Sequence, residues 1–200
     1  MSWANMLSST PFSTAPIRLH VISPLDPAWV ATAPDLATLE SAWLYDQGSL
    51  TRRLQALADG AFSVLPLREG WAHLREEECT ALGLPAQSLG WVREVFLYGR
   101  GERWVFARSV AARTALEHAG FALAELGSRS LGELLFCDPG FTRQPIEVCR
   151  YPASWLPEGC QLDGLWARRS RFDREDLSVL VAEVFLPTLW DEAVKSKGDR

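Results

Sequence analysis

The sequence has few of the residues from which metal sites are built. Its 200 residues include only four cysteines and three histidines. No two cysteines have the C-x-x-C spacing of a zinc site, and the histidines lie far apart in the chain. We therefore predict no metal centre, and we expect free thiols in a reducing, cytoplasmic environment. The residues are Cys79, Cys137, Cys149 and Cys160, and His20, His73 and His118.

A leader sequence, a membrane span and an excess of positive charge are also missing. The chain has no Lys or Arg before Arg18 and no continuous apolar run near that end, so we expect no signal peptide. No stretch approaches the roughly 20 apolar residues of a membrane span, so we expect no stable membrane insertion. The 25 acidic residues outnumber the 20 basic ones, and a net charge of −5 disfavours a protein that coats nucleic acid.

The composition is that of an ordinary globular protein. The chain is 48% apolar and 22% charged, and its 200 residues are enough for one domain with its own core. Residues 1–34 contain five prolines, so we interpret them as an extended arm. We predict one domain over residues 35–187 and a charged, frayed tail over 188–200. The nine tryptophans indicate buried rings or, less commonly, an aromatic ligand pocket.

The pattern of apolar residues predicts short helices followed mainly by strands. Asp35 and Ser49 are suitable N-caps for two helices that end near Gly48 and Gly60. A further helix is predicted over 112–126, and the stretch 130–133 fits a capping box. Strands are predicted over 62–71, 91–98, 103–110, 146–151, 165–173 and 177–186, with a loop at 152–163. Because 99–101 and 174–176 are typical of hairpin turns, we predict an α+β fold with a single antiparallel β-sheet.

Three charged residues lie on apolar sides of predicted strands. Side chains alternate along a strand, so Arg93, Arg108 and Glu183 each share a side with apolar residues. Arg108, for example, shares its side with Trp104 and Phe106. A buried charge is costly unless it is paired. Two interpretations stay open: a buried Arg–Glu pair that holds the sheet together, or a pocket in which Arg93 binds an anion and Glu183 a polar group of the same ligand.

Two further features attract anions. The run Arg168-Arg169-Ser170-Arg171 is basic, and a solvated strand face is our interpretation for two of its three arginines. The predicted helix starts at Leu50 and Leu131 expose backbone N–H groups that favour a negative charge.

Eight segments within residues 40–187 form an ordered set. They are SLTRRL (49–54), LREG (67–70), WVREVFL (91–97), WVFAR (104–108), LGELLF (131–136), FTR (141–143), LWARRSR (165–171) and EVFLP (183–187). In this order they resemble the chorismate pyruvate-lyase family, which makes 4-hydroxybenzoate for ubiquinone. The resemblance implies a sheet with helices over an internal ligand pocket, the elimination of pyruvate from chorismate, no cofactor, and a monomer.

The resemblance also implies roles for individual residues. Arg93 would hold the ring carboxylate of chorismate and of 4-hydroxybenzoate, and Glu183 would meet the ring hydroxyl. Leu131 would contribute its backbone N–H to the carboxylate. Leu50 stands where the family has a binding Met, so a backbone contact is expected there. Arg108 would meet the departing pyruvyl group.

The alternative is a non-catalytic domain of the same fold that binds an aromatic acid as an effector. Regulators of that kind carry a DNA-binding domain before the sensor, and residues 1–34 are too short for one. Both hypotheses predict that 4-hydroxybenzoate binds, so turnover separates them. Compared with the family, the chain has a longer N-terminal arm, an insertion at 152–163 and an extended tail.

Overall fold

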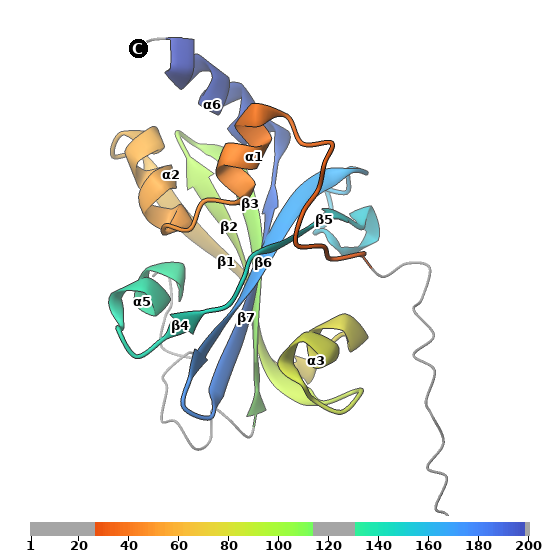
Figure 1. Cartoon of the computed structure of the whole chain (residues 1–200). Coiled ribbons are helices and arrows are strands. Elements are labelled where there is room, and N and C mark those ends of the chain that lie inside the picture. The colour runs from red at the N-terminus through yellow and green to blue at the C-terminus, as the bar shows by residue number, and fades with distance from the viewer. Residues whose placement is uncertain (1–26, 114–130, 199–200) are drawn as a thin grey trace, which may run out of the picture.

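The protein consists of one β-sheet with helices on both faces, in a computed structural model that describes residues 27–113 and 131–198 (Figure 1). The helices are α1 (Thr38–Leu44), α2 (Leu50–Ala58), α3 (Glu76–Leu82), α5 (Leu131–Cys137) and α6 (Pro187–Gly198), with a short 3-10 helix, η2, at Ala153–Trp155. The strands are β1 (Phe62–His73), β2 (Leu89–Gly99), β3 (Glu102–Ala112), β4 (Thr142–Arg143), β5 (Glu147–Tyr151), β6 (Leu165–Arg174) and β7 (Leu177–Phe185).

The strand pairs of the sheet are antiparallel, in the order β1-β2-β3-β7-β6-β4, with β5 also paired to β6. The predicted hairpins join β2 to β3 and β6 to β7. In the first of them Arg100 and Gly101 have φ of 52° and 81°, and such left-handed values suit a two-residue hairpin turn. The predicted α+β fold with an antiparallel sheet is confirmed, and β3 and β7 lie at its centre.

The two faces of the sheet have different covers, and we name each face by one of its residues. The Arg93 face also carries Glu183, whereas Arg108 projects from the Arg108 face. Figure 1 shows α2 and α5 on one side of the sheet and α3 on the other. No described helix is long and apolar enough to cross a membrane.

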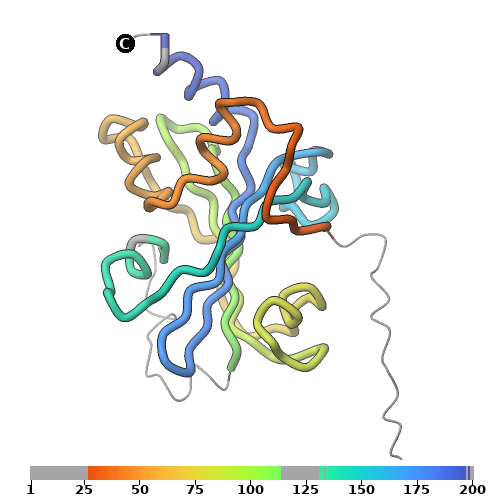
Figure 2. The backbone as a smooth tube through the Cα atoms, viewed as in Figure 1, coloured from red at the N-terminus to blue at the C-terminus, as the bar shows by residue number. Residues whose placement is uncertain are grey.

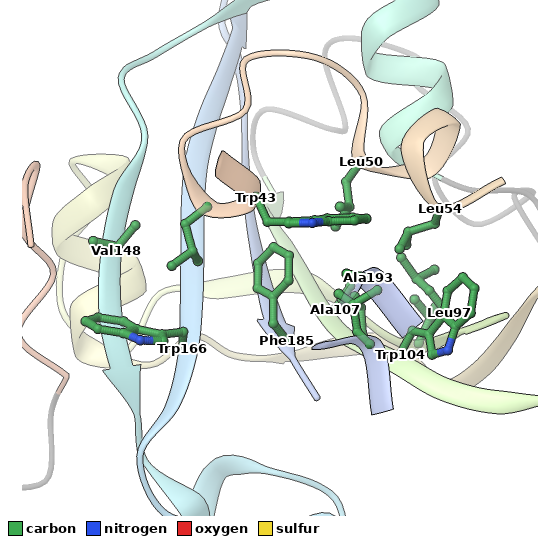
Figure 3. Close-up of a cluster of buried hydrophobic side chains, with 14 of the residues drawn as sticks. Trp43, Leu50, Leu54, Leu97, Trp104, Ala107, Val148, Trp166, Phe185 and Ala193 are labelled. Atoms are coloured by element: carbon green, nitrogen blue, oxygen red, sulfur yellow. The ribbon is translucent and has the colours of Figure 1, made fainter. Parts of the chain in front are cut away.

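A large apolar cluster joins the first two helices and α6 to the Arg93 face (Figure 3). Helix α2 forms because Ser49 caps it, accepting a hydrogen bond from the Arg52 N–H at 3.4 Å. Its residues Leu50, Leu54 and Ala58 recur every four positions and are buried on one side. A second apolar cluster packs α5 on the Arg93 face. Two other apolar clusters lie on the Arg108 face.

The segment before α1 runs beside β5 (Figure 2). Val30 and Val148 exchange both backbone hydrogen bonds, at 2.9 and 2.8 Å. The described end of the predicted arm is therefore attached to the sheet, and the arm's residues 1–26 lie outside the described residues.

The expectation of a frayed tail after Pro187 is wrong for residues 187–198, which form α6. Leu189 and Ala193, four residues apart, are buried, and the Trp190 ring stacks on Phe185 at 5.4 Å. Proline suits the first turn of a helix because the N–H that it lacks has no helical partner there. The sequence did not predict this helix because its apolar side is small and much of the segment is charged or polar.

Other differences are local. Helix α1 begins at Thr38 after Ala37, not after Asp35, and Glu40 accepts from the Ala37 N–H at 3.2 Å. Helix α3 and the two-residue strand β4 were not predicted. Most of the predicted helix 112–126 lies outside the described residues, as does Ser130 of the predicted capping box.

Candidate functional site

Polar side chains form a row across the centre of the Arg93 face. Strand register places Glu69, Arg93, Ser109 and Ser170 in this row, with the apolar Val181 of β7 between the two serines. Arg93, Ser109 and Ser170 are buried. Because burying polar groups is costly without partners, such a row in an apolar face indicates a structural network or a ligand.

Arg93 lies second in this row, next to Glu69. Only 2% of the residue is exposed, and its guanidinium forms an ion pair with Glu69 on β1. Burial lowers the pKa of Arg93 from its ordinary value. The pairing with Glu69 holds the guanidinium in place on the sheet.

Glu183 pairs with an arginine other than Arg93. Its Oε2 accepts from Nε of Arg168 at 2.6 Å, across the β6–β7 hairpin. Arg168 is 1% exposed, and its Nη1 donates to the carbonyl oxygens of Trp43 and Asp46 at 3.1 and 2.9 Å. Arg168 therefore orients Glu183 and fastens the connection between α1 and α2 to the sheet.

Arg143 lies on β4, at the edge of the sheet, and also contacts the connection between α1 and α2. Its Nε donates to Ser170 Oγ at 3.0 Å, and its Nη1 donates to the carbonyl oxygens of Gln47 and Asp46 at 3.1 and 3.4 Å. Burial and the nearby charge of Arg168 lower the pKa of Arg143 to about 10, so the group stays positively charged at neutral pH.

The centre of the Arg93 face carries small side chains. Strand β3 contributes Ala107, Ser109 and Ala111 to it, whereas Arg93 and Glu183 flank these residues on the adjacent strands. By strand spacing, the Cα atoms of Arg93 and Glu183 lie roughly 12 Å apart. The two long side chains therefore border a strip of alanine and serine.

Helix α2 begins with the predicted Leu50, and the predicted Leu131 is the first described residue of α5; both residues are buried. The first N–H groups of a helix have no helical partner, so Leu50 presents such a group at the start of α2. The two helices meet where Arg52 Nη2 lies 3.6 Å from Cys137 Sγ.

The expectation that Arg108 lies in the same site as Arg93 is corrected by the structure. Register pairs Arg93 with Ser109, so Arg108 projects from the opposite face. The cause is a bulge between Leu97 and Tyr98, because a one-residue shift moves every later side chain of a strand to the other face. Trp104 also leaves the predicted Arg108 side and packs in the cluster of the Arg93 face.

Arg108 is instead part of a structural network beneath α3. Its Nε and Nη2 donate to Glu78 at 2.6 and 3.0 Å, and its Nη1 donates to Glu94 at 2.6 Å. Burial alone would lower the pKa of Arg108, but the two carboxylates raise it above its ordinary value. Sequence reasoning missed Glu78 because it did not predict α3.

The run 168–171 is also more buried than predicted. Arg168 and Arg169 are both buried, and Arg169 pairs with Glu77 and Glu147 on the Arg108 face. Of these three arginines, only Arg171 matches the predicted solvated strand face: its side chain is partly exposed and pairs with Asp173. Among the described residues, no group of three or more His, Cys, Asp or Glu side chains could hold a metal ion.

Comparisons with known proteins agree with one another over most of the chain. Residues 28–195 match the family model described as "Chorismate lyase". A "Probable chorismate pyruvate-lyase" of Pseudomonas fluorescens Pf-5 is 63% identical over 167 residues, which are 82% of this chain and 89% of that protein. One of Pseudomonas aeruginosa UCBPP-PA14 is 68% identical over 151 residues, 76% of this chain and 85% of that protein.

Solved structures give a more distant likeness. The effector domain of PhnF from Mycobacterium smegmatis has a TM-score of 0.49 at 13% identity, and the match covers 72% of this chain and 91% of that one.

Proposed function

The chain belongs to the chorismate lyase family, and on this basis we propose that it converts chorismate into 4-hydroxybenzoate and pyruvate. In this reaction the ether bond between the ring and the enolpyruvyl group breaks, and its electron pair leaves with the ether oxygen. The ring carbon that bears the hydroxyl loses its proton, the ring becomes aromatic, and the enolpyruvate takes up a proton to give pyruvate.

The observation that carries the site assignment is the pair of charged residues on either side of small ones. We propose that the ring lies over Ala107, Ser109 and Ala111, with its carboxylate at Arg93 and its hydroxyl at Glu183. A planar guanidinium suits a carboxylate because two parallel N–H donors match its two oxygens. The carboxylate of Glu183, oriented by its bond to Arg168, accepts from the ring hydroxyl.

The backbone N–H groups of Leu50 and Leu131 complete the proposed binding set, as family resemblance implies. Both residues lie in helices that cover the Arg93 face, and Leu50, at the start of α2, has an N–H group without a helical partner that suits an oxygen of the ligand. Holding the substrate in one conformation away from water lowers the barrier without a separate acid or base for every proton. The monomeric state stays a prediction, which light scattering of the purified protein checks.

The test is to incubate the purified full-length protein with chorismate and follow both products. We expect 4-hydroxybenzoate, measured by absorbance, and pyruvate, measured with lactate dehydrogenase, to form in equal amounts. Binding of 4-hydroxybenzoate without turnover would instead favour the effector-binding domain.

A substitution tests the site itself. Arg93→Met should lower kcat/KM roughly 10- to 100-fold, since hydrogen bonds to charged groups contribute about 1.5–3 kcal/mol. Arg150→Met is the matched control, because the exposed Arg150 on β5 contacts, among the described residues, the Trp166 ring and the carbonyl oxygen of Gly164. Equal activity of the two variants would contradict the assignment of Arg93.

A further inference from the structure

Arg143 differs from the buried arginines of the sheet in its partners. Each buried arginine pairs with a carboxylate: Arg93 with Glu69, Arg108 with Glu78 and Glu94, Arg168 with Glu183, and Arg169 with Glu77 and Glu147. Arg143 forms no ion pair within the described parts of the chain, and its acceptors are one hydroxyl and two carbonyl oxygens. Its positive charge is therefore not neutralised by direct contact.

The donors of Arg143 are only partly used. Nε is bound to Ser170, and Nη1 is bound to the carbonyl oxygens of Asp46 and Gln47. No described residue accepts a hydrogen bond from Nη2, which has two hydrogens to donate. Nη2 is not one of the described buried nitrogens that lack a hydrogen-bond partner, so it keeps some accessible surface and a ligand oxygen can reach it.

The position of Arg143 relative to Glu183 is the third observation. Arg143 and Arg168 both donate to the carbonyl oxygen of Asp46, and Arg168 is bound to Glu183. Glu183 is close enough to act on the charge of Arg143 but forms no ion pair with it. Among the described residues here, the guanidinium groups of Arg53, Arg143 and Arg168 outnumber the carboxylates of Asp46 and Glu183, so a net positive charge remains at the hydroxyl end of the proposed site.

The surroundings of Arg143 strengthen its attraction for an anion. Its guanidinium lies 5.5 Å from the ring centres of both Phe136 and Phe172, which come from α5 and β6. Aromatic rings keep water away from the cation on that side, and a charge interacts more strongly where water is excluded.

We propose that Arg143 binds the second carboxylate of the substrate, that of the enolpyruvyl group, through its Nη2. The inference rests on the proposed function, because chorismate has two carboxylates and only the ring carboxylate is assigned to Arg93. The enolpyruvyl ether is attached to the ring beside the hydroxyl, and Arg143 lies beside the residue that we assign to that hydroxyl. As the ether bond breaks, negative charge develops on the departing enolpyruvate, and the fixed cation stabilises it.

A purely structural role for Arg143 makes a different prediction. Arg143 also holds the connection between α1 and α2, so its loss could disturb the whole site rather than one carboxylate. The decisive comparison is therefore between a ligand with one carboxylate and a ligand with two. 4-Hydroxybenzoate has only the ring carboxylate, and the 3-O-lactyl ether of 3,4-dihydroxybenzoate adds a second one across an ether oxygen.

The experiment compares wild type with Arg143→Met and Arg143→Gln in the full-length protein. Glutamine keeps an N–H donor for the carbonyl oxygens but lacks the charge, so it remains informative if the methionine variant does not fold. We expect both variants to bind 4-hydroxybenzoate as wild type does, by isothermal titration. Affinity for the lactyl ether and kcat/KM for chorismate should fall roughly 10- to 100-fold.

Arg53→Met is the matched control for the helix connection. Arg53 donates to the carbonyl oxygen of Ala42 and to the Asp46 carboxylate at 2.7 and 2.6 Å, so this variant loosens the same connection without removing the proposed carboxylate ligand. It should not discriminate between the two ligands.

Three outcomes are decisive. Equal losses for both ligands in the Arg143 variants would overturn the proposal in favour of a structural role. If Arg143→Gln turned over chorismate as fast as wild type, the role of Arg143 would be overturned. The proposed function would stand in that case, because the wild-type protein consumes chorismate. Failure of the wild type to consume chorismate would instead refute the proposed function itself.

Discussion

Replacing Arg108 by methionine should cost stability and spare catalysis. The substitution leaves the carboxylate of Glu78, which is 3% exposed, without both of its bonds to Arg108, and it leaves Glu94 without one. Removing one partner of a buried ion pair costs about 3–5 kcal/mol. That is a large part of the about 5–15 kcal/mol by which a domain is stable. In a chain of this size the melting temperature should fall by about 6–20 °C.

The double variant Arg108→Met/Glu78→Leu distinguishes a loss of stability, caused by the unpaired Glu78 carboxylate, from a loss of catalysis. Replacing both partners of a buried pair by apolar residues is often neutral for stability. The carboxylate of Glu94, which also loses Arg108, is 17% exposed and can be solvated. We expect calorimetry to show that the double variant regains most of the lost stability. Below the melting transition, kcat/KM for chorismate should stay within roughly threefold of wild type in both variants.

A double variant that melts like wild type but no longer consumes chorismate would refute a purely structural role for Arg108. Such a result would mean that Arg108 acts on the substrate despite projecting from the opposite face of the sheet. If Arg108→Met alone melted like wild type, the ion pairs of Arg108 would not stabilise the fold, and its proposed structural role would be refuted.

Three further predictions address other parts of the molecule. Glu183→Gln removes the proposed acceptor of the ring hydroxyl and should lower kcat/KM roughly 10- to 100-fold in steady-state assays; unchanged kinetics would contradict its role. Burial raises the pKa of Glu77 from 4.5 to about 7, so stability should fall as pH rises through that window, because the folded state binds the proton more tightly. In urea titrations at several pH values, Glu77→Gln should make the free energy of unfolding depend less on pH. An unchanged pH dependence would show that Glu77 is not its cause. At Gly99 a Cβ would lie 2.1 Å from the Trp104 ring, so Gly99→Ala should lose about 1–3 kcal/mol, unlike Gly198→Ala, which meets nothing.

The strands and one of the ion pairs follow from the sequence by simple rules. The pattern of apolar residues located the six longer strands: burial alternates along β1, whereas β3 and β7 pack on a core with both sides. The partner of Glu183 was also within reach of these rules. The β6–β7 hairpin closes with Arg174 opposite Leu177, and counting back from that pair along an undisturbed ladder places Arg168 opposite Glu183.

The same counting fails for Arg93 and Arg108, and the reason is tertiary. Near the β2–β3 turn the register is that of a simple hairpin, which, if continued, would set Arg108 opposite Arg93 on one face. The bulge shifts the ladder and buries the Trp104 ring against Gly99, a packing gain that no local propensity contains. The contacts of Arg143 with the α1–α2 connection likewise join residues almost 100 positions apart, beyond any short-range pattern.

Three of the four cysteines are buried, and Cys137, the last residue of α5, is exposed beside Arg52 of α2. A thiol-specific spin label or fluorophore would therefore attach to the native chain at a single position without any cysteine having to be removed. That position lies where the two helices over the proposed site touch. The signal of the label would report directly whether these helices separate when a ligand enters or leaves, and on what timescale.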